Sequence, residues 1–384
     1  MRLPGVEGTW DARFHGLVEA VADNLAEGLE LGMSLAVSVA GRNVVDLWGG
    51  HLDAARTRPW ERDSLVCVFS CTKGVVAMAT MWAVERGLVD LDAPVASYWP
   101  EFAAEGKGEL PVRWLLTHEA GLPAIGQRMP RGSLSDWDAM TTALAAQAPS
   151  WEPGTAHGYH GVTYGHLIGE VLRRATGRTC GALIRDELAG PLGVELWMPL
   201  PRERDADTAD LVVEMAPEGT FFDAWDPKTS LGPRAFGNPP DSNDPNHCMT
   251  DQWRRAEIPA ANMHSNARAL DRLYGVLATG GTSGDLVLAS PALVEEFGRC
   301  HVVGDDRVME LPTAFGLGFE HTIPEWPFGP GARTYGHNGS GGSLGFVDPD
   351  AGVSVGYAMN RLWWGADRTD PRWGRMFAEL YAVL

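Results

Sequence analysis

The segment from Gly74 to Val84 (GVVAMATMWAV) contains no charged residue, and Glu85-Arg86-Gly87 follows it. A helix that is apolar on every face must be covered by other layers of the fold. Gly87 is a typical end signal just past the last helical turn. The pattern therefore predicts a buried helix, and the remaining elements are expected to pack around it.

Hydrophobic spacing predicts further helices on both sides of this segment. They are expected over Asp11 to Glu27, Trp137 to Gln147, Val162 to Thr176, Ala267 to Thr279 and Arg372 to Val383. Short apolar runs predict strands over Met33 to Val39, Val44 to Trp48, Phe315 to Phe319 and Gly352 to Asn360. The first two strands are separated by Gly41-Arg42-Asn43, which is typical of a hairpin.

Strands near both chain ends and helices in the middle predict an α/β (α+β) fold. Residues 1–90 and 260–384 are expected to form one α/β body, with a mostly helical part inserted over residues 91–259. Gly232 to Asn246 is rich in turn-forming residues and is too long for an ordinary connection. Such a segment is typical of a functional cover or a mobile loop, and the sequence leaves open whether it closes over a site.

Composition narrows the classes of partner. Of 384 residues, 45% are hydrophobic and 21% charged, which is typical of a globular protein. The net charge of −19 argues against nucleic acid and anionic membranes as partners. No apolar run approaches the roughly 20 residues of a membrane span, and no secretory signal is visible, so we expect a cytoplasmic protein. Five cysteines do not suggest a disulfide framework. Oligomeric state stays open.

A hydroxyl and an amine stand at the start of the predicted buried helix. Ser70 and Lys73 are three residues apart, which places both side chains on one helix face. A serine needs a neighbouring base to act as a nucleophile, and a lysine serves if desolvation and the positive helix end lower its pKa. The free N–H groups there can also hold an oxyanion. For the isolated motif, a helix-capping serine with a surface lysine is the competing interpretation.

Two later segments carry candidate partners for this pair. Tyr159 follows Pro153-Gly154-Thr155 and can shuttle a proton if a cation lowers its pKa; Tyr164 competes for that role. The glycine-rich segment from Tyr335 to Pro349 lets backbone approach a ligand closely. An edge strand there could offer the Ser340 N–H as a second oxyanion donor. A structural tyrosine and a plain glycine-rich hairpin are the alternatives.

Together these motifs resemble those of a known family. They run in the order Ser70-Cys71-Thr72-Lys73, Leu115-Leu116-Thr117-His118 with Gly121-Leu122, Pro153-Gly154-Thr155 with Tyr159, Phe315-Gly316-Leu317-Gly318-Phe319, and His337-Asn338-Gly339. In this order the chain resembles serine hydrolases of the class C β-lactamase and penicillin-binding-protein type, and most of all the family VIII carboxylesterases, from about Gly32 to Asn360.

The resemblance implies a fold and a mechanism. The fold is β-lactamase/transpeptidase-like, with an antiparallel sheet flanked by helices and an inserted, mostly helical domain. The mechanism has Ser70 as nucleophile, Lys73 as base and Tyr159 as partner in proton transfer. It also has an oxyanion hole from the N–H groups of Ser70 and Ser340, and an acyl-enzyme released by water.

Two departures from the family pattern point to the substrate. Gly161 stands where lactamase members carry the Asn of Tyr-x-Asn, and His337-Asn338-Gly339 replaces Lys-Thr-Gly. Without that amide and that lysine, an anionic β-lactam is held poorly unless His337 is protonated. The sequence therefore favours a small, neutral, short-chain ester. An acyltransferase using the same acyl-enzyme, or a weak β-lactam hydrolase, is the alternative.

Substrate contacts are predicted for the third motif and for aromatic side chains. His337, Asn338 and Gly339 are expected to bind substrate, and Trp225 and Trp326 are candidates for the wall of an acyl pocket. For the tryptophans the assignment comes from residue type alone, and packing in the core explains them equally well.

Three rival functions fit the sequence less well. Gly341-Gly342-Ser343-Leu344-Gly345 matches an α/β-hydrolase elbow, but no histidine follows Ser343 and the next residues predict a strand. His157 and His160 lie in a segment that predicts a loop, with no acidic third ligand at a telling spacing, so neither a metal nor a cofactor is expected. A relative that binds without turnover would not need all of Ser70, Lys73 and Tyr159.

Overall fold

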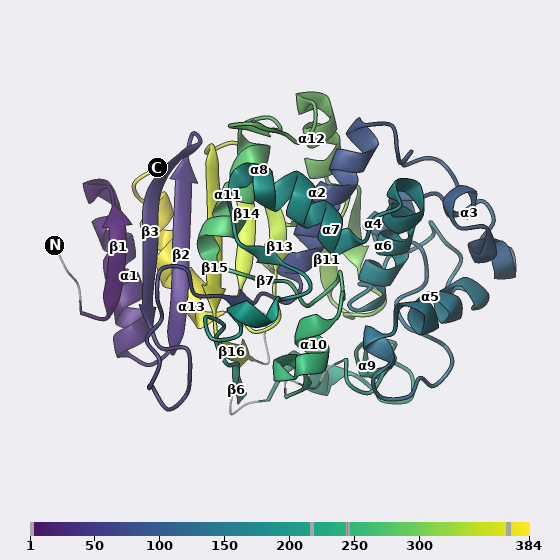
Figure 1. Cartoon of the computed structure of the whole chain (residues 1–384), viewed down its shortest axis with the longest axis horizontal. Coiled ribbons are helices and arrows are strands. Elements are labelled where there is room, and N and C mark those ends of the chain that lie inside the picture. Colours follow the sequence, from purple (N-terminus) through teal and green to yellow (C-terminus); the bar gives the residue numbers. More distant parts are fainter. Residues whose placement is uncertain (1–3, 216–218, 243, 245, 366–369) are drawn as a thin grey trace.

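The computed structural model describes residues 4–215, 219–242, 244, 246–365 and 370–384. A nine-stranded sheet forms the body, with neighbouring strands antiparallel in the order β1-β3-β2-β15-β14-β13-β12-β11-β10 (Figure 1). Its strands are β1 Val6–Trp10, β2 Gly32–Val39, β3 Arg42–Gly50, β10 Val302–Asp305, β11 Pro312–Phe315, β12 Glu320–His321, β13 Tyr335–Asn338, β14 Leu344–Asp348 and β15 Val353–Met359.

The two ends of the chain meet in the middle of this sheet. β2 pairs with β15 from Met33 opposite Met359 to Val39 opposite Val353. The predicted hairpin is present, since β2 and β3 are neighbours joined at Ala40-Gly41. Both faces of the sheet are covered, and the side chains of β2 and β15 are correspondingly apolar along most of their lengths.

Helices cover the sheet on both faces. Successive residues of β14 show this: Phe346 packs on Phe377 of α13 (Pro371–Tyr381), whereas Gly345 abuts the ring of Tyr274 in α11 (Ala267–Ala278). Because neighbouring residues of a strand point to opposite faces, α13 and α11 lie on opposite sides. α1 (His15–Ala26) packs beside α13, and α2 (Cys71–Glu85) lies on the α11 side (Figure 1).

The predicted central helix is α2, and it is buried as expected. Every residue from Cys71 to Ala83 is buried, because the sheet covers one side and the helices α6 and α7 cover another. The sheet side leaves little room: a β-carbon on Gly74 would lie 2.3 Å from the hydroxyl oxygen of Tyr274. α2 therefore sits between the sheet and the helical part of the chain.

The segment between α2 and α11 is mostly helical and irregular. Its helices are α3 Val95–Tyr98, α4 Arg113–Leu116, α5 Trp137–Ala146, α6 Thr163–Thr176, α7 Cys180–Ile184, α8 Gly190–Leu192, α9 Gly232–Gly237 and α10 Asp251–Arg255; α12 Pro291–Gly298 follows later. Small sheets add β4 Val66–Cys67, β5 Leu196–Trp197 and β7 His264–Ser265; β6 Val212–Met215 with β16 Arg361–Trp364; and β8 Thr282–Ser283 with β9 Leu286–Val287. A domain division at residues 91 and 259 stays a prediction.

Two expectations about strands need correction. The strand predicted over Phe315 to Phe319 ends at Phe315. Gly318 lies beyond it, and the Gly318 N–H donates to the carbonyl of Leu116. The predicted edge strand is β13, which is flanked by β12 and β14. Its pairing with β12 stops at Gly336, however, so the last residues of β13 are open on that side.

The turn-rich segment over residues 232–246 is not a plain loop. It begins with helix α9, and Asn238 fastens it by accepting from the Met129 N–H and donating to the carbonyls of Ile125 and Gln127. Positions 243 and 245 lie outside the described residues. Among the described helices, none combines the length and hydropathy that crossing a bilayer requires.

The packing of α11 on β15 predicts opposite effects for one substitution at two glycines. A β-carbon on Gly356 would lie 2.0 Å from the Ala267 carbonyl oxygen, whereas Gly374 in α13 faces open space. Gly356→Ala should destabilise the fold by about 1–3 kcal/mol through overpacking, and Gly374→Ala should stabilise it by about 0.5–1 kcal/mol. Thermal unfolding midpoints compare them; a higher midpoint for Gly356→Ala would contradict this packing.

Candidate active site

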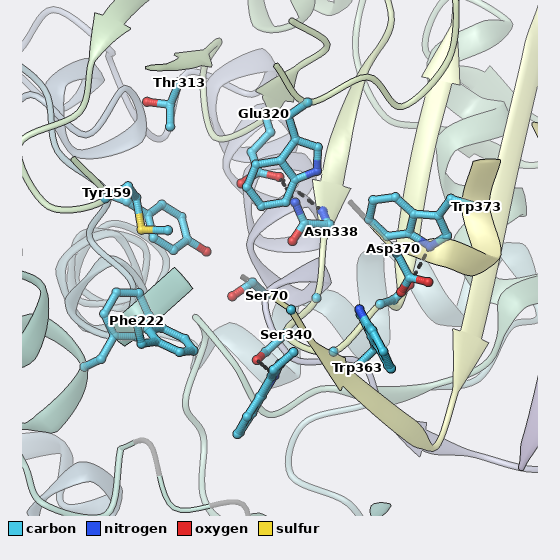
Figure 2. A pocket seen from close by; sticks show the side chains of 18 of the residues that line it. Ser70, Tyr159, Phe222, Thr313, Glu320, Asn338, Ser340, Trp363, Asp370 and Trp373 are labelled. Carbon is cyan, nitrogen blue, oxygen red and sulfur yellow. Dashed lines mark hydrogen bonds between the residues drawn. The ribbon is translucent and has the colours of Figure 1, made fainter. Parts of the chain in front are cut away.

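A cavity of about 110 Å³ opens beside the N-terminal end of α2 (Figure 2). Its walls come from distant parts of the chain, which the fold brings together around Ser70. The residues are Ser70, Tyr159, Phe222, Phe236, Met309, Thr313, Phe315, Glu320, Trp326, Asn338, Gly339, Ser340, Gly341, Gly342, Trp363, Trp364, Gly365, Asp370 and Trp373. Of the predicted site residues, Ser70, Tyr159, Asn338, Gly339, Ser340 and Trp326 lie in this wall.

Ser70 occupies the N-cap position of α2 without a capping hydrogen bond from its side chain, and the backbone just before it is strained. Phe69 has φ of +44°, a conformation that a bulky residue adopts only when its surroundings enforce it. The surroundings are tight: Val68 donates its N–H to the Met263 carbonyl, and the Thr72 N–H returns to the Phe69 carbonyl. The turn from strand to helix thereby presents the Ser70 side chain to the cavity.

Lys73 lies directly below Ser70 and has lost all contact with bulk water. Its Nζ is 3.0 Å from Ser70 Oγ, 2.8 Å from the Gly161 carbonyl oxygen and 2.9 Å from the Ala260 carbonyl oxygen. Burial lowers the pKa of the Lys73 ammonium to about 7, against the opposing effect of the negative charge of Glu320. A large fraction of Lys73 is therefore a neutral amine near pH 7.

The partners of Lys73 suit that neutral form. A neutral amine has two N–H donors and one lone pair; the two carbonyls accept from the N–H groups, and the lone pair is left for the Ser70 hydroxyl. The other fully buried lysine, Lys107, offers a contrast, since its Nζ donates to three carbonyls, those of Ala104, Ala145 and Gln147. Three acceptors match an ammonium, which has three donors. Lys73 instead has two carbonyl partners, and its third neighbour is the Ser70 hydroxyl, which accepts from an ammonium but donates to a neutral amine.

The two candidate tyrosines lie on different sides of Lys73. Tyr159 lines the cavity, with its ring centroid 4.8 Å from Lys73 Nζ, and Figure 2 shows its hydroxyl directed toward Ser70. Tyr164 is fully buried in α6, and its hydroxyl donates to the Lys73 carbonyl oxygen at 3.4 Å. Desolvation raises the pKa of Tyr164 far above its usual range. The geometry therefore favours Tyr159 as the tyrosine that can reach a reacting group.

Two backbone N–H groups at the cavity are available for an oxyanion. Among the described residues, neither the Ser70 nor the Ser340 N–H donates a hydrogen bond. Ser340 occupies a tight turn closed by the Gly342 N–H, which donates to the Gly339 carbonyl at 3.0 Å. The Ser340 side chain is occupied separately, because its Oγ accepts from Trp364 Nε1 at 3.0 Å. Free N–H groups beside a serine hydroxyl are the donors that acyl transfer needs.

Comparison with known proteins identifies the family. The sequence profile of the β-lactamase family matches residues 18–378. The chain belongs to the β-lactamase family. Esterase/beta-lactamase LipL from Mycobacterium tuberculosis is 36% identical over 367 residues, covering 93% of this chain and 83% of that protein.

Solved structures agree with this assignment over the whole chain. A penicillin-binding protein homologue from Caulobacter crescentus superposes with a TM-score of 0.90 at 38% identity, covering 99% of this chain and 100% of the other. A family VIII carboxylesterase superposes with a TM-score of 0.89 at 35% identity, with the same coverage. The resemblance inferred from the ordered motifs, and the β-lactamase/transpeptidase-like fold that it implied, are confirmed.

In the third motif of this β-lactamase-family chain, Asn338 faces the cavity and the neighbouring His337 does not. His337 is 1% exposed and does not line the cavity; burial lowers its pKa to about 3, so the imidazole is neutral. The protonated His337 considered from the sequence is therefore not supported. Asn338 does face the cavity, and its side-chain amide donates to Glu320 Oε2 at 2.6 Å. Among the described residues of the third motif, none supplies a cation in place of the family's lysine.

Gly161, which stands where lactamase members carry an asparagine, has a steric cause. A β-carbon on Gly161 would lie 2.8 Å from the ring of Phe236, so this aromatic ring occupies the space of the family's asparagine side chain. Trp225 lies behind that ring, with centroids 5.5 Å apart, and is absent from the cavity wall. The expected substrate contact of Trp225 is thus replaced by packing, and Phe236 forms the wall instead.

Several wall residues were not singled out from the sequence. Glu320 follows the motif Phe315 to Phe319 directly, and Trp363 and Trp364 form a conspicuous pair between the last strand pattern and the C-terminal helix. A cluster of tryptophans near a glycine-rich segment is a usable signal for a binding surface, whereas nothing in the local sequence marks Asp370 or Glu320. These residues reach the site only through tertiary structure.

The structure also locates the residues of the alternative α/β-hydrolase and metal sites. A strand, β14, follows Ser343, and Ser343 is fully buried, which is not the exposed elbow of an α/β-hydrolase. The His157 ring bonds to Thr313 Oγ1 at 2.8 Å, and His160 Nε2 accepts from the Leu122 N–H. Within the described residues, no group of three or more His, Cys, Asp or Glu side chains is arranged to hold a metal ion.

Proposed function

We propose that this member of the β-lactamase family is a serine carboxylesterase that hydrolyses small, short-chain esters through an acyl-enzyme on Ser70. The observation that carries the proposal is the placement of a desolvated amine 3.0 Å from the Ser70 hydroxyl oxygen, inside a cavity with two free backbone N–H groups. The similarity to an esterase in sequence and to a family VIII carboxylesterase in structure supports the same activity.

The first half-reaction follows from this geometry. Neutral Lys73 takes the proton of Ser70 as Oγ attacks the ester carbonyl carbon, and the resulting ammonium keeps the Gly161 and Ala260 carbonyls as acceptors. The carbonyl oxygen, now an anion, is stabilised by the N–H groups of Ser70 and Ser340. Collapse of this intermediate breaks the bond to the alcohol, which leaves with a proton delivered from Lys73 through Tyr159.

The second half-reaction restores the enzyme. Water replaces the alcohol in the cavity, loses a proton to the amine–tyrosine pair and attacks the acyl carbon. The same two N–H groups stabilise the second oxyanion, and Ser70 regains its proton as the carboxylic acid departs. An alcohol or amine in place of this water would give the acyltransferase alternative, so the ratio of transfer product to acid with an added alcohol distinguishes the two activities.

The wall of the cavity supports a neutral ester as substrate. Eight of its nineteen residues are aromatic, and the third motif offers a buried neutral histidine instead of a lysine. A substrate carboxylate would therefore find no fixed cation at that position, which disfavours an anionic β-lactam. Weak β-lactam hydrolysis remains the secondary activity to assay, since the LipL relative carries both names. The cytoplasmic location stays a prediction.

Removing either member of the Ser70–Lys73 pair should abolish turnover without unfolding the protein. Ser70→Ala should leave no measurable hydrolysis of p-nitrophenyl acetate, because it removes the hydroxyl that lies 3.0 Å from the buried amine of Lys73. Lys73→Ala should lower kcat by about 10²–10⁴-fold, the usual contribution of a general base. Thermal melts show whether the fold is intact, and full activity of folded Ser70→Ala would refute the assignment.

The tyrosine pair provides a matched control within the same experiment. Tyr159→Phe should lower kcat by orders of magnitude because its hydroxyl faces the cavity, whereas Tyr164→Phe removes a buried hydroxyl that reaches only a backbone carbonyl. If Tyr164→Phe were the crippling change, the proton path drawn here would be wrong.

The lowered pKa of Lys73 predicts the pH dependence of hydrolysis. Only the neutral amine accepts the proton of Ser70, so kcat/KM for a neutral ester should rise with pH and level off above about 7. Glu320→Gln removes a negative charge that raises this pKa, and should move the midpoint to lower pH. Lys228→Ala, at an exposed lysine, is the control. A profile that falls from pH 6 to 8 would contradict Lys73 as the base.

A further inference from the structure

Arg372 is a fully buried cation that contacts the turn carrying Ser340. It lies in the first turn of α13 and is 1% exposed. Its Nη2 donates to the Gly341 carbonyl at 2.6 Å, and its Nη1 donates to the Arg361 carbonyl at 2.7 Å. Trp363 donates its N–H to the same Gly341 carbonyl at 3.0 Å. The buried guanidinium of Arg372 therefore bonds to backbone next to the cavity.

Two peptide planes connect this contact to the Ser340 N–H. The Gly341 carbonyl and the Gly342 N–H belong to one rigid peptide plane, and that N–H donates to the Gly339 carbonyl at 3.0 Å. The Gly339 carbonyl and the Ser340 N–H belong to a second peptide plane, which this hydrogen bond links to the first. Because a trans peptide points its C=O and N–H in opposite directions, fixing the Gly341 carbonyl fixes the direction of the Ser340 N–H.

The turn needs an anchor of this kind because of its composition. Gly341 and Gly342 have φ of +86° and +124°, conformations that glycine adopts readily and leaves equally readily. A side chain that would restrict the turn cannot be added, since a β-carbon on Gly342 would lie 2.1 Å from Arg372 Nη2 and one on Gly341 would lie 2.6 Å from Leu362 Cβ. Contacts from outside the turn must therefore hold its peptide planes.

We propose that Arg372 is a positioning residue for ester hydrolysis: it holds the Gly341 carbonyl so that the Ser340 N–H points at the developing oxyanion. The proposal rests on the proposed function, in which the Ser340 N–H is an oxyanion donor. Trp373 works alongside it, since its Nε1 donates to the Gly342 carbonyl at 3.0 Å, and Figure 2 shows Trp373 beside Asp370.

An arginine suits this position better than a lysine. Arg372 donates to both carboxylate oxygens of Asp370 and lies 3.5 Å from Glu30 Oε2 while it also reaches the two carbonyls. The planar guanidinium serves these partners in fixed directions, which an ammonium on a flexible stem does not. Asp370 is the principal counter-charge, because burial raises the pKa of Glu30 to about 8. The remaining guanidinium donors bond to backbone carbonyls.

The test compares an ester with the corresponding thionoester, in which sulfur replaces the carbonyl oxygen. A sulfur anion gains little from N–H donors, so the ratio of kcat/KM for p-nitrophenyl acetate to that for its thiono analogue measures the oxyanion site. The ratio does not depend on how much enzyme is folded. Arg372→Lys and Arg372→Gln should each lower it about tenfold or more, within the 10²–10³-fold cost of losing an oxyanion donor.

Arg375→Gln is the matched control, because Arg375 is an exposed arginine of the same helix that pairs with Glu27 at the surface. It should keep the wild-type ratio. A wild-type ratio in both Arg372 variants would overturn the positioning role while leaving the esterase proposal intact. Failure of Arg372→Lys to fold would overturn it too, since that variant keeps the charge that the carboxylates require. Loss of the proposed function itself would appear first, as a wild-type enzyme without esterase activity.

Discussion

The proposed chemistry depends on the pair of backbone carbonyls, from Gly161 and Ala260, that hold Lys73 beneath Ser70. They give the buried amine two carbonyl acceptors, and its third polar neighbour is the Ser70 hydroxyl at 3.0 Å. An ammonium there directs its last proton at Ser70 Oγ, whereas a neutral amine turns its lone pair to the serine hydroxyl. Lys107, with three carbonyls, shows that the same fold can also bury a lysine in the opposite way.

The architecture serves this arrangement. α2 is apolar on all sides because the sheet and the helical segment enclose it, and that enclosure is what removes water from Lys73. Gly161 and Ala260 come from the helical segment, whereas the Ser340 turn comes from the sheet and is held by α13. The site is therefore a junction of three parts of the fold: α2 supplies Ser70 and Lys73, the helical segment supplies the two carbonyls that hold Lys73, and the sheet supplies the turn with the Ser340 N–H.

The sequence predicted the parts of this structure that are local. The buried helix over Gly74 to Val84, the β2–β3 hairpin and the ordered family motifs are visible in residue patterns, and the structure bears out the first two. The positions of Glu320, Phe236 and Arg372 depend on contacts between residues far apart in the chain, and no periodicity reports these. The same limit applies to His337 and Trp225, which have suitable chemistry but are buried and absent from the cavity wall, and this placement could not be seen from residue type.

The most direct measurement is the titration of Lys73 itself. The sequence contains three lysines, Lys73, Lys107 and Lys228, so a protein labelled with ¹³C at the lysine ε-carbon gives three resolvable NMR signals, assigned by substitution. The account predicts that Lys73 titrates with a midpoint near pH 7. If the Lys73 signal kept the chemical shift of an ammonium above pH 9, this result would contradict the claim that burial makes this amine the base for Ser70.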